Sequence, residues 1–329
     1  MNDAASMEFA PWQQRAYARA SEGIDGGRMG HALLFAGPAL LGKRRVAERL
    51  AHRMLCAAPL GNAACGHCRA CQLLAAGTHP DYHLVTLAMN REGTRLRTEI
   101  VIDQVRALSE KLSLTPQYGD TLVAIVDPAD LLNHAGCNAL LKTLEEPQPG
   151  RFLWLLAANP MRLPATIRSR CQRLEFRLPP RTEALAWLAT RGHGDAVAVE
   201  ALDAARGHPG LADAWLRDGG IALRREVAAD LAKVARGDIG VAEAAQRWTA
   251  DDEAAMRLRH AAELALATAT GLTDPLRTRK LARWFDAANR TRDLLRTTVR
   301  ADLAVAELLL AWRDDHDTAA GGKARGGRA

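Results

Sequence analysis

Short apolar runs alternate with helix-like segments through the first half of this chain. Four such runs lie at residues 31–36, 84–87, 121–126 and 152–157. Between them, stretches such as 102–112 place apolar residues three or four positions apart, the spacing of an amphipathic helix. A run as uniformly apolar as 121–126 is typical of a strand buried on both faces of a parallel sheet. The alternation therefore predicts a doubly wound α/β domain that ends near residue 176.

Helical patterns replace the strands beyond Leu178-Pro-Pro180. We expect short helices over 182–191, 197–205 and 211–217, and longer ones over 221–315 with breaks at Gly237, Gly240 and Gly271. The final stretch, AAGGKARGGRA, has no apolar side chain larger than alanine and is expected to be disordered. The sequence thus predicts an α/β domain at 1–176, a small helical domain at 177–220, a second helical domain at 221–318 and a tail at 319–329.

The composition limits the classes of protein to which the chain can belong. Of its 329 residues, 48% are hydrophobic and 25% charged, as in ordinary globular proteins, and only 5% are aromatic, which disfavours an all-β sandwich. No run approaches the about 18 apolar residues of a membrane helix. The N-terminus lacks the basic flank and apolar stretch of a secretory signal. We therefore expect a cytoplasmic location and reduced cysteines.

A glycine-rich turn follows the first apolar run and opens a helix. Its sequence, Gly37-Pro-Ala-Leu-Leu-Gly42-Lys43-Arg44, matches the phosphate-binding loop GxxxxGK[ST] up to the last position. In that loop backbone amides cradle phosphate oxygens, the lysine reaches the outer phosphates and the hydroxyl residue ligates Mg²⁺. Arg44 has no acceptor atom and cannot ligate a cation. Gly37, Gly42 and Lys43 are candidate nucleotide-binding residues of a degenerate loop; the alternative is a turn that binds nothing.

A second ATPase element is eroded in the same way. The run 121–126 ends in Asp127, where a carboxylate would stand beside Mg²⁺, but the next residue is Pro128. Hydrolytic ATPases of this class place a glutamate there to polarise the attacking water, and proline cannot act as a base. Because both elements lack the group that the chemistry needs, we expect the isolated chain to hydrolyse no ATP.

Four of the six cysteines gather in one short stretch, C-x8-C-x2-C-x2-C, at Cys56, Cys65, Cys68 and Cys71. Four thiolates are enough for a closed tetrahedral Zn²⁺ site, which has no open position for water and is therefore structural. Four reduced, buried thiols without metal are the alternative, and His67 and His79 are competing ligands. We expect Cys137 and Cys171 to pack in the interior.

Five motifs, in order, resemble one family. They are HALLFAGPALLGK at 31–43, CGHCRAC at 65–71, AGTHPD at 76–81, NALLKTLEEP at 138–147 and SRC at 169–171. Together they resemble the bacterial DNA polymerase III clamp-loader ATPases, the AAA+ clamp-loader family, over about residues 12–215. The eroded loop looks like that of the family's non-hydrolysing subunit. The family's motors, gamma and tau, keep a Thr after the loop Lys and a Glu after the strand Asp.

The resemblance implies a fold, a role and a set of partners. The fold is an AAA+ α/β domain with a zinc-binding insertion at 56–71, a small helical lid and a C-terminal helical collar through which five subunits form a ring. The role is that of a stator-like, replisome-associated subunit that catalyses nothing alone but belongs to the DNA-directed DNA polymerase holoenzyme, a nucleotidyltransferase complex. The partners are the gamma/tau and delta subunits, with the sliding clamp and primer-template DNA reached through the complex.

The resemblance also assigns individual residues. Arg170 of the Ser-Arg-Cys motif looks like the arginine finger that AAA+ subunits insert into a neighbour's ATP site, where it stabilises charge on the γ-phosphate. The alternative is a surface arginine near a helix end. Ala157 and Ala158 stand where the family's sensor usually has a hydroxyl group. Gly210 stands where the motors carry an arginine that touches their own nucleotide. These departures agree with ATP and Mg²⁺ binding that is absent or vestigial.

Two other functions compete with this interpretation. An atypical but active AAA+ ATPase of DNA replication or repair would need the groups that Arg44 and Pro128 replace. A zinc-ribbon module that binds nucleic acid is allowed by the cysteines alone, but the surrounding AAA+ motifs argue against it.

The net charge of +6 is concentrated in the segment that begins at Leu276. Within it, Arg292, Arg296 and Arg300 recur every four residues and are expected to share one helix face. Such a face either contacts an acidic subunit or DNA phosphate, or is a solvated surface, and we favour the solvated surface.

Overall fold

The computed structural model describes residues 8–295 and 297–321. The chain divides into two compact units, the first made of the residues up to 191 together with 207–211, and the second of 192–206 together with the residues from 212 onward. The domain boundaries predicted at 176, 220 and 318 stay predictions. Among the described helices, none is long and apolar enough to cross a membrane.

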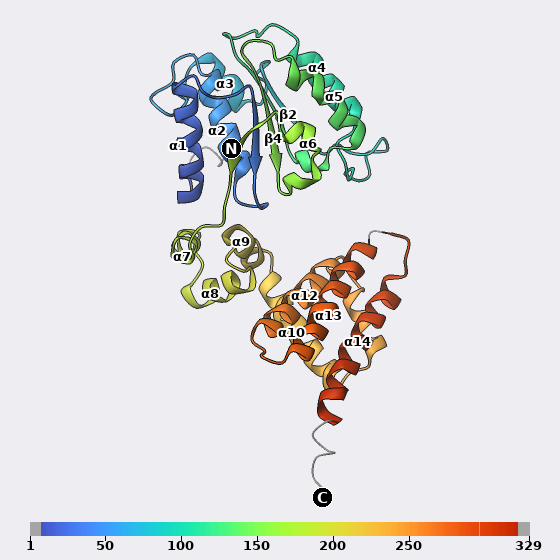
Figure 1. The fold of residues 1–329 in the computed structure, drawn as a ribbon. Helices are drawn as coiled ribbons and strands as arrows, with labels where there is room; N and C mark the ends of the chain where they lie inside the picture. Colours follow the sequence, from blue (N-terminus) through green and yellow to red (C-terminus); the bar gives the residue numbers. More distant parts are fainter. Residues whose placement is uncertain (1–7, 296, 322–329) are drawn as a thin grey trace, which may run out of the picture. The chain divides into compact units, whose positions relative to one another are not determined.

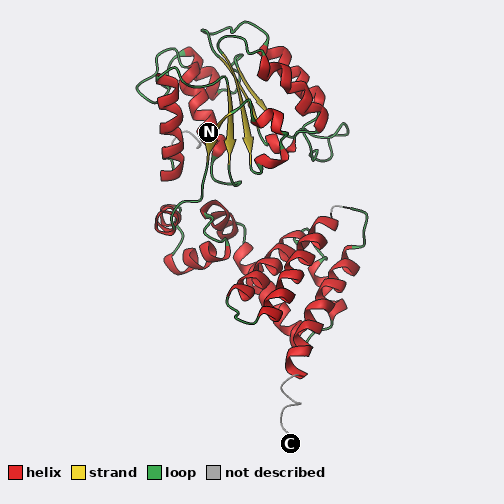
Figure 2. Ribbon diagram, in the orientation of Figure 1, coloured by secondary structure: helices red, strands yellow, loops and turns green. Residues whose placement is uncertain are grey.

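A five-stranded parallel sheet forms the centre of the first unit (Figures 1 and 2). Its strands lie in the order β2-β3-β4-β1-β5. Their bounds are β1 Ala32–Ala36, β2 Tyr82–Val85, β3 Leu122–Val126, β4 Arg151–Ala157 and β5 Gln172–Glu175. The central pairings place Leu34 opposite Leu155 and Ala124 opposite Leu153. The predicted parallel α/β sheet is confirmed.

Helices cover both faces of this sheet (Figure 1). One face packs against α1 Pro11–Asp25, α2 Lys43–Leu55 and α3 Arg69–Ala75. The other packs against α4 Ile102–Leu112, α5 His134–Glu145 and α6 Ala165–Arg168. Two short 3₁₀ turns, η2 Ala129–Leu131 and η3 Pro160–Arg162, follow β3 and β4, and α7 Arg181–Thr190 follows β5.

Alternate side chains of each strand enter two separate hydrophobic cores. Phe35, Ile125 and Trp154 point to the core under α1 and α2, whereas Leu34 and Leu155 point to the core under α4 and α5. All five are fully buried. Because successive side chains of a strand face opposite sides, a strand between two cores must be apolar at every position, which is the pattern seen in the sequence.

The second unit is helical. Its helices are α8 Asp195–Ala204, α10 Gly220–Arg236, α11 Val241–Trp248, α12 Ala254–Thr270, α13 Pro275–Leu294 and α14 Ala301–Gly321, and α9 Pro209–Arg217 belongs partly to each unit. The predicted breaks are confirmed, since Gly237 ends α10 with a φ of 76°, Gly240 precedes α11 and Gly271 ends α12. Trp284 and Trp312 lie together in the core of this bundle, with ring centroids 4.6 Å apart.

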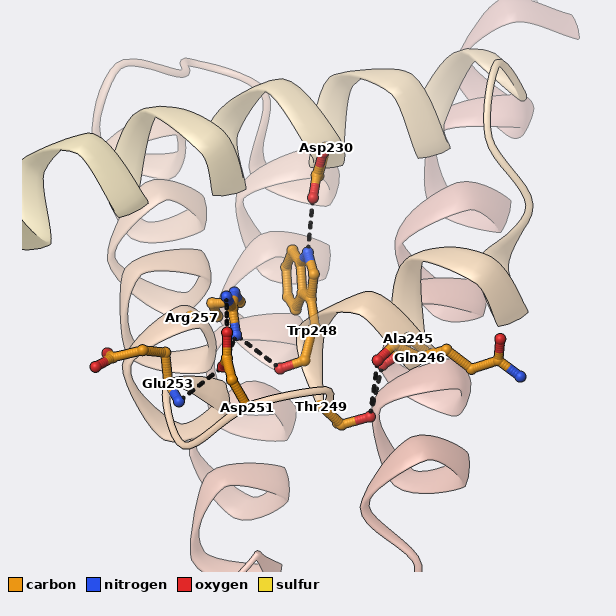
Figure 3. Close-up of polar contacts among 8 residues, drawn as sticks. All are labelled: Asp230, Ala245, Gln246, Trp248, Thr249, Asp251, Glu253 and Arg257. Atoms are coloured by element: carbon orange, nitrogen blue, oxygen red, sulfur yellow. Dashed lines mark hydrogen bonds and ion pairs between the residues drawn. The ribbon is translucent and has the colours of Figure 1, made fainter.

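Side chains from three helices fix the turn between α11 and α12 (Figure 3). Trp248 Nε1 donates to Asp230 Oδ2 of α10 at 2.9 Å. Arg257 of α12 donates to the Trp248 carbonyl at 3.2 Å and pairs with Asp251, which also accepts the Glu253 N–H. The hydrogen bonds from Arg257 lower the pKa of Asp251 to about 2. The tryptophan therefore packs in the core while its indole N–H and backbone carbonyl are both satisfied.

The predicted arginine face on α13 is wrong. Helix α13 ends at Leu294, and Arg300 lies after the turn that follows, immediately before α14. Arg292 pairs with Asp293 at 3.8 Å, while Arg300 pairs with Asp302 at 2.5 Å. Arg296 lies outside the described residues. The spacing fits a single helix, but the chain turns within it, so Arg292 and Arg300 cannot share a helix face.

His260 on α12 is a buried histidine between two arginines. It is fully buried, and its ring meets Trp215 edge-on with centroids 4.7 Å apart. Burial, aided by the positive charges of Arg224 and Arg259, lowers the pKa of His260 to about 4. The folded chain therefore holds this imidazole in its neutral form at pH 7.

We expect this histidine to make the second unit less stable in mild acid. Its pKa in the folded chain lies below the unfolded value of about 6.5, so below about pH 6.5 the unfolded chain binds a proton that the folded chain does not. The free energy of unfolding should therefore fall by about 1.4 kcal/mol per pH unit between about pH 6.5 and pH 4. Urea unfolding of the full chain at pH 7.5 and 5.5 measures this loss. A His260→Phe variant should lose less stability than the wild type over the same interval, and an equal loss in both would contradict the assignment.

Candidate functional site

The loop between β1 and α2 has the backbone of a phosphate-binding loop. Gly37 has a φ of 144°, and a Cβ there would lie 2.1 Å from the carbonyl oxygen of Phe176. Gly42 has a φ of 82° and precedes the first residue of α2, and a Cβ there would lie 2.1 Å from the side-chain amide nitrogen of Gln13. Gly37 is therefore required for conformation and for space, because its neighbour is backbone, whereas Gly42 is required for its left-handed conformation.

Lys43 is turned into the carbonyl groups of its own loop. Its Nζ donates to the Gly37 and Pro38 carbonyl oxygens, both at 2.7 Å, and only 8% of the residue is exposed. Burial lowers the pKa of Lys43, and the nearby carboxylates of Asp127 and Asp130 partly oppose this shift. The ammonium group that would reach outer phosphates is thus occupied by the backbone around it.

Arg44 forms an ion pair with the carboxylate at the end of β3. Its Nε donates to Asp127 Oδ2 at 2.5 Å, and its Nη2 lies 3.4 Å from the Asp127 carbonyl oxygen. In a working ATPase of this class, the hydroxyl residue and this acid lie on the two sides of Mg²⁺. Here the Arg44 guanidinium, which carries no acceptor atom, pairs with that carboxylate.

The first residues of α1 hold the loop from one side. Trp12 Nε1 and Gln13 Nε2 both donate to the Leu41 carbonyl, at 3.1 and 3.2 Å. Gln13 also accepts the Ala10 N–H through Oε1 at 3.2 Å. Nothing in the sequence pattern signals the role of Gln13, because a loop held through its carbonyls has no residue signature.

The start of α9 lies against the same loop within the first unit. His208 Nε2 lies 2.8 Å from the Ala39 carbonyl oxygen. A Cβ at Gly210 would lie 2.0 Å from the Leu40 carbonyl oxygen, so this position admits glycine alone. Gly210, the position at which the family's motors carry an arginine, therefore lies directly against the loop.

The end of β4 carries no hydroxyl group beside the loop. The strand ends at Ala157, and Ala158 precedes Asn159, whose N–H donates to Asp130 Oδ2 at 2.8 Å. Asp130 is buried, and its second oxygen has no partner among the described residues. The sequence did not identify Asp130, which lies three positions after Asp127 in the turn η2.

Arg170 lies just after the short helix α6 and is tied at both ends of its guanidinium. Nη1 donates to the Thr166 carbonyl at 2.9 Å, and Nη2 lies 2.6 Å from Glu145 Oε1. Its side chain is 37% exposed. The next residue, Cys171, is buried in the core between the sheet and α5, and burial raises its pKa to about 11. The buried cysteine anchors the motif while the arginine remains at the surface.

The four clustered cysteines converge at the N-terminal end of α3. All four Sγ atoms lie within 4.8 Å of one another, and the Cys56–Cys68 and Cys65–Cys71 pairs are each 3.9 Å apart. A tetrahedral zinc with Zn–S bonds of about 2.3 Å needs sulfur atoms about 3.8 Å apart. The Cys71 N–H donates to Cys68 Sγ at 3.5 Å and lowers the pKa of that thiol to about 6. The cluster therefore fits a four-sulfur metal site.

The two histidines near this cluster make other contacts. His67 is exposed, and its Nδ1 lies 2.9 Å from the Cys65 carbonyl oxygen. His79 is buried, accepts the Asp81 N–H at Nδ1, and has its pKa lowered by burial. Asp81 in turn accepts the N–H groups of Gln117 and Tyr118 at 2.8 and 2.7 Å. The GTHPD motif therefore holds the turn that leads into β3.

Comparisons with known proteins agree with these features. The family described as "DNA polymerase III, delta subunit" matches residues 12–180. A DNA polymerase III subunit delta-prime from Pseudomonas aeruginosa is 38% identical over 73% of this chain and 71% of its own length. One from Escherichia coli is 39% identical over 56% of this chain and 53% of its own length. A subunit gamma/tau from Mycobacterium bovis is 36% identical over 54% of this chain and 30% of its own length.

These matches confirm the resemblance to clamp-loader proteins. The alignment spans just over half the length of the E. coli relative. The parallel sheet and the helical regions that follow it, together with the family match, confirm the predicted AAA+ fold class. The chain therefore belongs to the DNA polymerase III, delta subunit family, in which it resembles the delta-prime subunits.

Proposed function

We propose that the chain is a non-hydrolysing, stator-like subunit of the bacterial DNA polymerase III clamp loader, and thereby a component of the replisome and of the polymerase holoenzyme. With gamma/tau and delta subunits it would help to place the sliding clamp on primed DNA. The observation that supports this most directly is the ion pair between Arg44 and Asp127, which fills the cation position of its own degenerate ATP site.

Three features oppose ATP hydrolysis by this chain. Arg44 supplies no oxygen to Mg²⁺, Pro128 supplies no base, and Lys43 is bonded to loop carbonyls. Binding a magnesium–nucleotide complex would require the chain to break the Arg44–Asp127 pair and to free Lys43. An atypical but active ATPase is therefore the weaker candidate.

Arg170 is the residue through which this subunit would act on ATP. It is partly exposed and its guanidinium is held in one orientation. In NTPases a guanidinium supplied to the γ-phosphate accelerates hydrolysis by about 10³–10⁵-fold. We propose that Arg170 is inserted into the ATP site of a neighbouring subunit as an arginine finger.

The four-cysteine cluster would hold a structural Zn²⁺. Two of its sulfur pairs are 3.9 Å apart, close to the spacing of a tetrahedral ion, all four sulfur atoms lie within 4.8 Å of one another, and all four cysteines are free thiols. The segment that carries these cysteines is also linked to the helices on its side of the sheet. Arg53 of α2 donates to the Gly61 carbonyl at 3.2 Å and pairs with Asp25 at the end of α1.

The isolated chain should hydrolyse no ATP, whereas the assembled complex should hydrolyse it with stimulation by DNA. The test measures turnover and DNA binding by the purified chain, and repeats both with gamma and delta subunits, the clamp and primed DNA. Robust hydrolysis by the chain alone would reject the proposal in favour of an active ATPase. Tight DNA binding by the chain alone would favour a nucleic-acid-binding module.

Replacing Arg170 by alanine should leave the fold intact but slow the ATP site that it serves by about 10³-fold or more. The expected result is an unchanged melting temperature of the isolated chain and lower DNA-stimulated turnover in the reconstituted complex. Arg162→Ala is the control, because Arg162 is an exposed arginine in the preceding turn. Unchanged turnover with Arg170→Ala would remove the arginine-finger role.

Metal analysis of the purified protein should find about one zinc per chain, as four thiolate ligands predict. A Cys68→Ser variant should lose the metal and melt at a lower temperature, as should the wild type after treatment with a chelator. Cys137→Ser is the matched control, since Cys137 is buried outside the cluster and should leave the zinc content unchanged. Less than about half an equivalent of zinc on intact wild-type protein would count against the site.

A further inference from the structure

The last residue of α5, Glu145, contacts the guanidinium of Arg170. Arg170 Nη2 and Glu145 Oε1 lie 2.6 Å apart and form an ion pair. Glu145 belongs to the Leu-Glu-Glu-Pro stretch at 144–147, to which the proposed function assigns no role. The two residues are 25 positions apart, so α5 and the Ser-Arg-Cys turn are brought together only by the fold.

A second element holds the other terminal nitrogen of the same guanidinium. Arg170 Nη1 donates to the Thr166 carbonyl at 2.9 Å, and Ser169 Oγ donates to the same carbonyl at 3.1 Å. Thr166 lies in α6, whose Ile167 is fully buried against the sheet. The arginine is therefore oriented by two separate supports, a carboxylate on α5 and a carbonyl on α6.

This arrangement leaves part of the guanidinium available to a ligand. Of its five N–H groups, one on Nη1 donates to Thr166, while Nη2 lies beside the Glu145 carboxylate. Among the described residues Nε–H has no hydrogen-bond partner, so the guanidinium keeps donors that could reach phosphoryl oxygens. The side chain is 37% exposed and Glu145 is 48% exposed, so the pair lies at the surface and not in the core.

Glu145 could either restrain Arg170 from reaching a phosphate or orient its guanidinium toward one. The exposure of the pair favours the second role. Ion pairs at an exposed site contribute little free energy, because water screens both charges. Such a pair cannot hold Arg170 back from a triphosphate, which carries several negative charges. It can select one side-chain rotamer among several, because long arginine side chains lose much conformational freedom when they are held in place.

We propose that Glu145 is a positioning residue for Arg170, orienting its guanidinium before it meets the γ-phosphate of ATP in a neighbouring subunit. The inference rests on the proposed arginine-finger role of Arg170. It adds that α5 takes part in that role through its final carboxylate. ATP itself would be bound by the neighbour, so Glu145 should affect the rate of hydrolysis and not the affinity for ATP.

The test uses the full chain reconstituted with gamma and delta subunits, the clamp and primed DNA. Glu145→Gln should lower kcat for ATP about threefold to tenfold with an unchanged KM, while the melting temperature of the isolated chain stays the same. The Glu145→Asp variant keeps the negative charge on a side chain that is one methylene shorter, and its kcat should lie between those of the wild type and Glu145→Gln. Glu146→Gln is the matched control: the described part of the chain gives Glu146 no ion pair, and it should match the wild type.

A double variant separates this inference from the proposed function. On the Arg170→Ala background, Glu145→Gln should cause no further loss, because a positioning residue acts only through the group that it positions. A further loss there, or no effect of Glu145→Gln alone, would overturn the positioning role while leaving the arginine finger in place. A gain in kcat with Glu145→Gln would also overturn it, since it would mean that the carboxylate restrains Arg170. If Arg170→Ala itself has no effect, the proposed function fails instead.

Discussion

The proposed absence of ATP hydrolysis by this sheet domain depends most on the ion pair between Arg44 and Asp127. A phosphate-binding loop works because it leaves donors and a cation position open to a ligand. Here the Arg44 guanidinium lies 2.5 Å from the Asp127 carboxylate. Lys43 donates to two carbonyl oxygens of the loop, and Trp12 and Gln13 donate to a third. Arg44 pairs with the acid, and Lys43 is the ammonium group, that a magnesium–nucleotide complex would use, whereas Trp12 and Gln13 hold a backbone carbonyl that such a complex does not contact.

The same contacts connect the loop to both neighbouring helices of the fold. The loop joins β1, the strand between β4 and β5, to α2, whose apolar face fills one of the two cores. Helix α1 binds the loop at its beginning and pairs with Arg53 of α2 at its end, where Arg53 also reaches the cysteine module. These contacts support the proposal that the subunit is a fixed partner in the assembly, because nucleotide binding to this loop would have to break the Arg44–Asp127 pair and free Lys43.

The sequence predicted much of this fold because most of its signals are local. Strands buried between two cores are uniformly apolar, so β1, β3 and β4 could be located closely, and the helix α4 was predicted with its observed bounds. Strand β5 was missed because Gln172-Arg-Leu-Glu lies at the sheet edge and buries only Leu174. The predicted strand at 84–87 is observed at Tyr82–Val85, since the other edge strand is only half buried. The Arg44–Asp127 and Arg170–Glu145 pairs join residues that are distant in sequence. The sequence therefore places these residues in motifs but does not predict that they form ion pairs.

The loop keeps some residues of the phosphate-binding motif GxxxxGK[ST] and replaces others, and this difference has a physical explanation. Gly37 and Gly42 are required by positive φ values and close contacts, whether or not a phosphate is bound. Lys43 donates to the Gly37 and Pro38 carbonyls, so it stabilises the loop without a ligand. The hydroxyl and the catalytic glutamate of a working site have no such second role, and Arg44 and Pro128 occupy their positions. A loop can therefore keep the appearance of a nucleotide site for structural reasons alone, and its chemistry must be judged from the residues that serve only the ligand.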